Sequence, residues 1–177
     1  LEPFSHQSFA DYSDVVIIIN NQSEVSRTIG TAFALAREIP PERVLLLTNE
    51  STPTSEIINS NQFTTYFADP ISDMISDRNL TGINVLVTTK GVPLGVNGGT
   101  NSRASFDSEL ALIDGPYASS IFGDWYANSN YGLAAGNEMK AFDRSEQGYY
   151  LVSRLTGFDV ETALSLISKT NNSLGQH

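Results

Sequence analysis

The sequence contains no cysteine, and its only two histidines, His6 and His177, lie near the two ends of its 177 residues. Without cysteine the chain has no disulfides, no thiolate nucleophile and no cysteine-ligated zinc site. Histidines placed in this way also argue against a serine–histidine or cysteine–histidine catalytic pair. Carboxylate, hydroxyl, amide and cationic side chains are left as the candidates for any chemistry.

Positive charge is also scarce, with 10 Lys and Arg residues against 20 Asp and Glu, a formal net charge of -10 and a pI of about 4.4. Nucleic acids and anionic membranes require a basic face, so we expect neither as a partner. No apolar run approaches the roughly 18 residues of a membrane span, so we expect no membrane insertion. A small molecule, a glycan, a peptide or a divalent cation remains as a partner, and the oligomeric state stays open.

Four apolar runs have the aliphatic, β-branched composition of strands that are buried on both faces. They lie at 14–20, 43–48, 83–88 and 149–153. Helical periodicity separates them over 25–39, over 60–75 with Ser60 as the cap and an interruption at Pro70, and over 160–167. The alternation predicts an α/β fold, a three-layer α-β-α sandwich around a mostly parallel sheet of about four strands in the order 2-1-3-4.

The length predicts a single domain over 1–177, with an N-terminal arm at 1–13 and a frayed tail at 171–177. Before the last strand, the segment 114–148 is rich in glycine and aromatic residues and has no clean period. We interpret it as a long excursion or lid. Its aromatic side chains either anchor the loop to the domain or stack on a sugar ring: Tyr117, Trp125, Tyr126 and Tyr131.

Polar residues follow the predicted strands at their carboxyl ends, the edge where open parallel sheets bind ligands. This edge is predicted to collect a set of ligand-binding side chains and turn residues: Asn20, Ser23, Thr89, Lys90, Gly91 and Arg154. Lys90 or Arg154 would hold an anionic group. Each also has a structural explanation, because Asn20 and Ser23 suit helix caps, Lys90 and Gly91 suit a turn, and Arg154 suits a salt bridge.

Asp107 and Glu109 are the candidate catalytic or metal-binding pair, in Ser105-Phe106-Asp107-Ser108-Glu109 directly before an apolar run. In one interpretation they bind a divalent cation, or act as acid and base together with Lys90, while Ser105 and Ser108 contact the ligand. In the other interpretation they occupy the first turn of a helix, where the helix dipole favours carboxylates.

Three motifs carry a resemblance: Val87-Thr88-Thr89-Lys90-Gly91-Val92-Pro93, Asp107-Ser108-Glu109-Leu110-Ala111-Leu112 and Leu151-Val152-Ser153-Arg154-Leu155-Thr156-Gly157. With them the chain resembles, over nearly its whole length, a family of bacterial and archaeal proteins that are often exported and have no assigned activity. The resemblance implies an exported α/β domain. A looser likeness to caspase and gingipain domains concerns architecture alone, because no histidine follows Thr88-Thr89 and no cysteine follows the fourth strand.

Two functions are consistent with these features. The clustering of charge beside a glycine-rich loop favours a metal-assisted hydrolase that uses Asp107, Glu109 and Lys90. The lack of cysteine and of internal histidine, together with the aromatic excursion, favours a non-catalytic cell-surface or carbohydrate-binding module.

Overall fold

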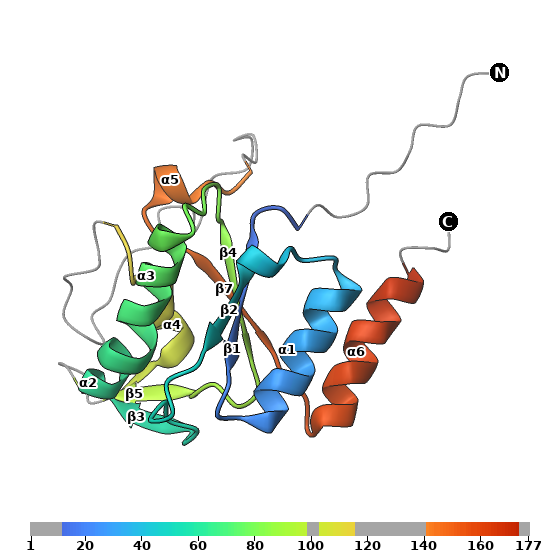
Figure 1. The fold of residues 1–177 in the computed structure, drawn as a ribbon, viewed down its shortest axis with the longest axis horizontal. Helices are drawn as coiled ribbons and strands as arrows, with labels where there is room; N and C mark the ends of the chain where they lie inside the picture. The colour runs from blue at the N-terminus through green and yellow to red at the C-terminus, as the bar shows by residue number, and fades with distance from the viewer. Residues whose placement is uncertain (1–11, 99–102, 116–140, 174–177) are drawn as a thin grey trace, which may run out of the picture.

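The computed structural model describes residues 12–98, 103–115 and 141–173. Its central sheet contains β1 (Val15–Asn20), β2 (Val44–Leu47), β4 (Val85–Thr89) and β7 (Leu151–Leu155). The strands are hydrogen-bonded in the order β2-β1-β4-β7 and every pair is parallel (Figure 1). This confirms the predicted order, since these are the second, first, third and fourth of the four predicted strands.

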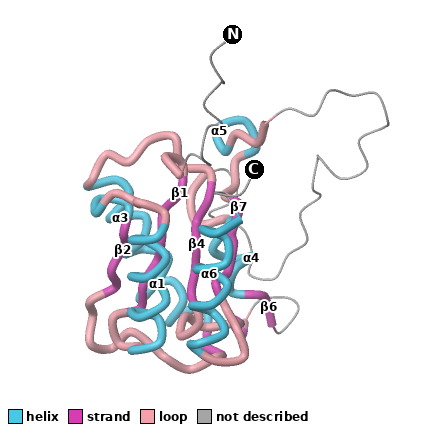
Figure 2. The backbone as a smooth tube through the Cα atoms, turned by 90° about the vertical axis from the view of Figure 1, so that its right-hand side faces the viewer, coloured by secondary structure: helices cyan, strands magenta, loops and turns pink. Residues whose placement is uncertain are grey.

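Helices cover both faces of this sheet, so the predicted three-layer sandwich is confirmed (Figures 1 and 2). One face packs against α1 (Glu24–Ala36) and α6 (Val160–Ser173). The other face packs against α3 (Asp69–Asp77) and α4 (Phe106–Ala111). Strand β1 contributes side chains to the cores on both faces of the sheet, because successive side chains alternate between the faces. Val16 and Ile18 lie in the core beneath α3 and α4, and Ile17 and Ile19 in the core beneath α1 and α6.

The sequence sets the ends of α1 through its capping residues. The Ser23 hydroxyl accepts a hydrogen bond from the Ser26 amide at 3.2 Å, which fulfils its predicted role as a cap. The helix ends before Glu38, which has a positive φ of 52°, and Pro40 follows. A short 3-10 turn, η1 (Pro41–Arg43), then leads into β2.

The second predicted helix is built from three consecutive pieces: α2 (Ser60–Phe63), a π turn η2 (Thr64–Ala68), and α3. Its cap is Asn59 rather than Ser60, because Asn59 and Gln62 exchange hydrogen bonds in a capping box. The interruption expected at Pro70 takes the form of the π turn, which ends directly before the first turn of α3.

A second, three-stranded sheet was not predicted. It consists of β3 (Ile57–Asn59), β5 (Gly95–Asn97) and β6 (Arg103–Ser105), with β3 and β5 parallel and β5 and β6 antiparallel. Each strand has three residues, which is too short to show a period in the sequence. Ile58 and Val96 bury their side chains in the same core as Phe106, so the second sheet packs against the core between the central sheet and α3 and α4.

Within the predicted excursion at 114–148, the structure describes a short helix, α5 (Arg144–Gln147), which Asp143 caps and Gly148 ends at a φ of 78°. The predictions for 1–11, 116–140 and 174–177, including those for the four excursion aromatics, fall outside the described residues. The predicted frayed tail begins too early, because α6 continues to Ser173.

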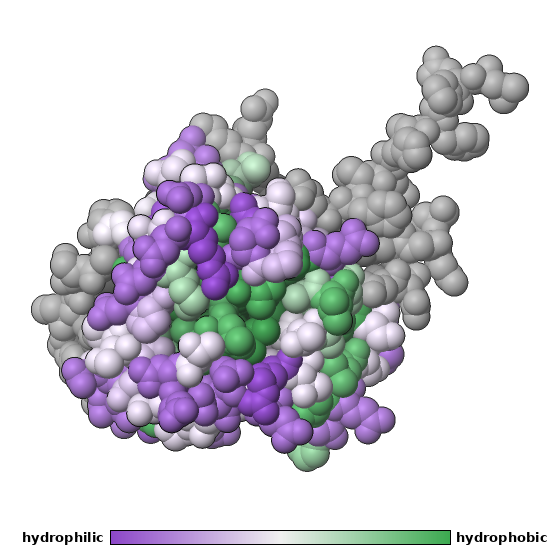
Figure 3. Space-filling view, in the orientation of Figure 1, coloured by the Kyte–Doolittle hydropathy of each residue, from purple (hydrophilic) through white to green (hydrophobic). Residues whose placement is uncertain are grey.

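None of the described helices combines the length and apolarity needed to cross a membrane. On the face drawn in Figure 3, apolar side chains come to the surface between α3 and α1, where the edge strand β2 lies. Leu46 of that strand is 38% exposed.

Candidate functional site

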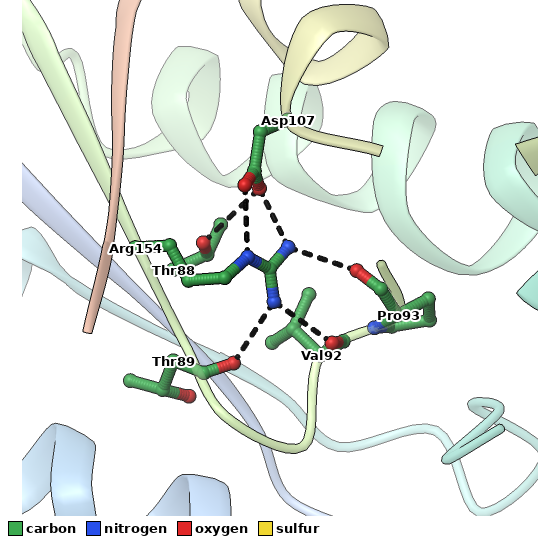
Figure 4. Close-up of polar contacts among 6 residues, drawn as sticks. All are labelled: Thr88, Thr89, Val92, Pro93, Asp107 and Arg154. Carbon is green, nitrogen blue, oxygen red and sulfur yellow. Dashed lines mark hydrogen bonds and ion pairs between the residues drawn. The ribbon is translucent and has the colours of Figure 1, made fainter. Parts of the chain in front are cut away.

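At the carboxyl edge of the sheet, Arg154 is bound by five acceptors (Figure 4). Its Nε and Nη2 donate to the two carboxylate oxygens of Asp107 at 2.8 and 2.6 Å. The remaining donors reach three backbone carbonyls: Nη1 binds Thr89 and Val92 at 3.3 and 2.9 Å, and Nη2 binds Pro93 at 2.8 Å. All five N–H donors of the guanidinium are therefore used within the chain.

The Asp107 carboxylate is equally committed. Besides Arg154, its Oδ1 accepts a hydrogen bond from the Thr88 hydroxyl at 3.2 Å. The Arg154 and Asp107 side chains are 11% and 28% exposed, so the pair is largely shielded from water. We call this arrangement of Asp107, Arg154 and the turn 89–93 the arginine latch, because it ties β7 and α4 to the turn after β4.

Glu109 does not join Asp107. Both residues lie in α4, and side chains two positions apart on a helix do not face each other. The two carboxylates therefore point to different sides of α4. Their position in its first turn agrees with the helix-start interpretation. Ser105 and Ser108 are both exposed, and the Ser105 side chain makes no capping hydrogen bond to α4.

The turn after β4 is also tied to α1. The buried Asn20 side chain donates to the carbonyls of Pro53 and Gly91 at 2.8 and 3.2 Å. The Ser26 and Thr89 hydroxyls are 2.6 Å apart. Gly91, at a φ of 95°, lies so close to Ser23 that a Cβ there would be 2.1 Å from the hydroxyl oxygen. The switch point between β1 and β4 is therefore filled by the protein's own turn.

Lys90 points to a different partner from the one expected. Its Nζ donates to the carbonyls of Gly157 and Phe158 at 3.0 and 2.6 Å, in the loop after β7. The structure therefore brings Asp107, Thr89 and Arg154 together, and Asn20 with Gly91. It places Lys90 on a separate loop contact, and each of these groups serves the fold.

The predicted divalent cation does not fit this edge. Asp107 offers its oxygens to a guanidinium, whose positive charge would oppose a cation at the same place. Over the three described stretches there is no group of three or more His, Asp or Glu side chains arranged to hold a metal ion.

We therefore expect Mg²⁺, Ca²⁺ and Mn²⁺ to leave the melting temperature unchanged in a thermal-shift series, because only an ion that binds the folded state raises it. The Asp107→Asn variant is expected to melt lower than the wild type and to be equally indifferent to the ions. A rise in melting temperature with one ion that disappears in Asp107→Asn would restore the metal site.

A second polar cluster, which the sequence did not single out, lies at the amino edge of the sheet. It lines a pocket of about 670 Å³ between α3, α5 and the residues just before β4 and β7. We call this the amino-edge pocket. Its polar lining includes Ser72, Asn84, Asp114, Arg144 and Tyr150, and its apolar lining includes Ile75, Leu80 and Ile83.

Asp114 is the centre of this cluster. Its two carboxylate oxygens accept hydrogen bonds from the Ser72 and Tyr150 hydroxyls at 2.8 and 3.1 Å. Arg144 stacks on the Tyr150 ring at 4.0 Å from the ring centroid, and its Nη2 lies 3.8 Å from Asp114 Oδ2. That distance is an ion pair without a hydrogen bond. The Arg144 and Asp114 side chains are 27% and 30% exposed.

Burial, followed by the negative charge of Asp114, raises the pKa of the Tyr150 phenol above its ordinary value, and the positive charge of Arg144 opposes the shift. Tyr150 therefore keeps its proton at neutral pH and serves as a hydrogen-bond donor. It does not act as a general base.

Sequence reasoning missed this cluster because its members come from five separate segments and share no motif. Asn84 precedes a strand, where no ligand contact is expected in an open parallel sheet. The one available signal is the run of polar residues 143–146 beside Tyr150 in a chain poor in charge.

Comparison with known proteins found no match: no family model, no curated protein and no solved structure is significantly similar to this chain.

Proposed function

We propose that this chain is an exported, non-catalytic binding domain that takes a neutral sugar in the amino-edge pocket. The observation that carries the proposal is the contrast between two arginine–aspartate pairs. Arg154 uses all five donors on Asp107 and on the backbone, and Asp107 accepts three hydrogen bonds, from Arg154 and from the Thr88 hydroxyl. Within the described residues, Asp114 accepts only two hydrogen bonds and the Arg144 guanidinium makes none, and both side chains line a pocket.

The unused capacity is considerable. A carboxylate accepts about four hydrogen bonds, and Asp114 accepts those of Ser72 and Tyr150. Arg144 stands beyond hydrogen-bond distance of Asp114, and its buried Nε has no acceptor in the described structure. A ligand with several hydroxyl groups can donate to Asp114 and accept from the outer nitrogens of Arg144 at once.

The charges around the pocket favour a neutral ligand. Among the described lining residues, Asp114 and Asp143 carry negative charge and Arg144 carries positive charge. The whole chain has a formal net charge of -10. An anionic sugar or a phosphate would meet net repulsion. Ile75, Leu80 and Ile83 provide an apolar wall for the C–H surface of a sugar ring. The volume lies in the usual range for small-molecule sites.

The hydrolase interpretation has weaker support. Its three residues are engaged elsewhere: Asp107 in the arginine latch, Glu109 on another side of α4, and Lys90 on the carbonyls of Gly157 and Phe158. Export is proposed from the family resemblance, and fractionation of cells that produce the full-length protein tests it.

The proposed binding is tested by calorimetric titration with neutral monosaccharides and disaccharides and with glucuronate. We expect a neutral sugar to bind and glucuronate to bind more weakly. Arg144→Leu should lower the affinity for the neutral sugar by roughly tenfold or more, the usual loss when a charged hydrogen-bond donor is removed. Recovery of the sugar unchanged supports binding without catalysis.

Arg103→Leu is the matched control, because Arg103 is an exposed arginine on β6 outside the pocket. Its affinity is expected to equal that of the wild type. If no neutral sugar binds, or if Arg144→Leu and Arg103→Leu bind it alike, the amino-edge pocket is not a sugar site.

A further inference from the structure

The outer edge of β7 is a second surface with binding capacity. β7 is the last strand of the central sheet, and no strand of the described residues pairs with its outer side (Figure 2). The other edge strand, β2, is partly covered, because Arg78 Nη1 donates to the carbonyls of Glu42 and Val44 at 2.8 and 2.9 Å.

The ladder with β4 determines which backbone groups face outward. The Leu151 amide donates to Asn84 O, and Leu155 O accepts from the Lys90 amide, both at 2.9 Å. In a parallel strand the amide and carbonyl of one residue point to the same side, and successive residues alternate. The backbone groups of Leu151, Ser153 and Leu155 therefore face β4, while those of Val152 and Arg154 face outward.

The outer edge of β7 is covered at its start, where the Tyr150 amide donates to the Ala111 carbonyl of α4 at 2.9 Å, but within the described residues no backbone hydrogen bond covers Val152 or Arg154. Natural edge strands are protected by proline, by outward lysine, by a bulge, by an inward-pointing charge, or by a covering helix or loop. Of these devices β7 has the inward charge and the partial cover by α4, and it lacks proline, lysine and a bulge. β7 reads Leu-Val-Ser-Arg-Leu and pairs with β4 in unbroken register. Its one charged side chain, Arg154, turns inward to the arginine latch.

An apolar pocket adjoins the same strand. It has a volume of about 440 Å³ and lies between α1, α6 and the β4–β7 half of the sheet. Its lining is mostly apolar, including Val85, Leu155, Leu166 and Ile167, and it also includes Arg37 and Arg154. Leu166 and Leu151 are 53% and 41% exposed at this side of the sheet. An added strand would place alternate side chains over this apolar surface.

Carboxylates stand beyond both ends of β7. Asp143 and Glu146 precede it, and Asp159 and Glu161 follow it, all of them exposed. Arg144 lies next to the first pair but is directed to Asp114 and Tyr150, and Lys90 at the other end is bound to the carbonyls of Gly157 and Phe158. The surroundings of this edge are therefore acidic.

We propose that β7 accepts an extended peptide of a partner protein as a fifth strand. The fitting partner segment has alternating apolar residues and basic residues at both ends. Backbone hydrogen bonds to Val152 and Arg154 would supply affinity, the apolar pocket would receive side chains from one face, and the flanking carboxylates would select the basic ends. The inference does not require the sugar pocket between α3 and α5 to bind a ligand, although Asp143 belongs both to the lining of that pocket and to the carboxylates before β7.

A short fluorescein-labelled peptide of alternating valine and threonine, with a lysine pair at each end, is a suitable probe. We expect saturable binding in fluorescence anisotropy that weakens as salt is raised. Hydrogen exchange should slow at the amides of Val152 and Arg154 when the peptide is added. The Leu151 and Ser153 amides already face β4 and should not change.

Leu166→Lys is expected to lower the affinity for the peptide by roughly tenfold or more, because it replaces an apolar contact with a positive charge that repels the lysines of the peptide. Leu46→Lys, the same change at an exposed leucine of the opposite edge strand, is expected to have no effect. The proposal is overturned if the two variants weaken binding equally, if no binding occurs, or if binding leaves the Val152 and Arg154 amides unprotected. If hydrogen exchange at these amides slows when the protein concentration is raised without peptide, the edge pairs with a second copy of the chain, and the proposal of a partner peptide is overturned.

Discussion

The Arg154→Met variant is expected to lose about 3 kcal/mol of unfolding free energy, the usual cost of removing one partner of a shielded ion pair. Methionine fills much of the same volume but leaves Asp107 without its counter-charge. It also removes the Arg154 donors from the carbonyls of Val92 and Pro93, while the Thr89 carbonyl keeps the hydrogen bond from the Val92 amide at 3.1 Å. Urea denaturation followed by circular dichroism measures the loss.

Two further variants separate the latch from a catalytic role. Arg103→Met should stay within about 0.5 kcal/mol of the wild type, as expected for a surface position. Arg154→Met combined with Asp107→Leu should recover part of the stability, because the double change leaves no unpaired charge. If Arg154→Met is as stable as the wild type, the arginine is not a structural residue, and the carboxyl edge returns as the candidate ligand site.

Phe106→Ala should have a comparable or larger effect, with a loss of about 3–5 kcal/mol of unfolding free energy. Phe106 is fully buried, and its ring packs edge-on against Phe63 and Phe67 at centroid distances of 5.2 and 5.0 Å. It stands one residue before Asp107, and the Arg154 guanidinium lies 5.9 Å from its ring centroid. The substitution therefore opens a cavity directly beside the arginine latch.

The same denaturation experiment measures this loss. Phe158→Ala is the matched control, since Phe158 is 93% exposed and its removal should change the stability by no more than about 0.5 kcal/mol. A double variant with Arg154→Met is informative, because neighbouring sites couple. Full additivity of the two losses would show that α4 is held by its aromatic packing independently of the latch.

The polar residues of the carboxyl edge therefore serve the folding of this domain. In an open parallel sheet this edge is the usual place for a ligand. Here Asn20, Gly91 and the arginine latch hold the turn after β4 against α1 and α4. The unused hydrogen-bonding capacity lies at the opposite edge, around Asp114 and Arg144.

Much of the architecture could be predicted because it follows from short-range patterns. The apolar runs of β1, β2 and β4 are dense and continuous, and the helical periods between them are long enough to require parallel crossovers. The three-residue strands of the second sheet could not be found in this way, since each is held by pairing with its neighbours rather than by its own pattern.

For the candidate site, the sequence correctly indicated which polar residues lie at the carboxyl edge, but not what they do there. Asp107 and Glu109 look like a pair in a linear spacing, and the helix that contains them turns them apart. The helix-cap and salt-bridge interpretations of Ser23 and Arg154 are the ones that agree with the geometry.

By itself, the amino-acid sequence determined the strands, the helices and the lack of thiol chemistry, because composition and period act locally along the chain. The layers and the parallel strand order followed from the helical crossovers between the strands. Only the tertiary structure distinguished Arg154 from Arg144. Both are arginines near an aspartate in a chain poor in charge. Arg154 is saturated because the carbonyls of Thr89, Val92 and Pro93, more than 60 positions away, converge on its guanidinium. Arg144 meets no such set among residues 12–98, 103–115 and 141–173, and its remaining capacity faces a pocket. Whether a charged side chain holds the fold or is left for a ligand depends on how many acceptors the fold brings to it.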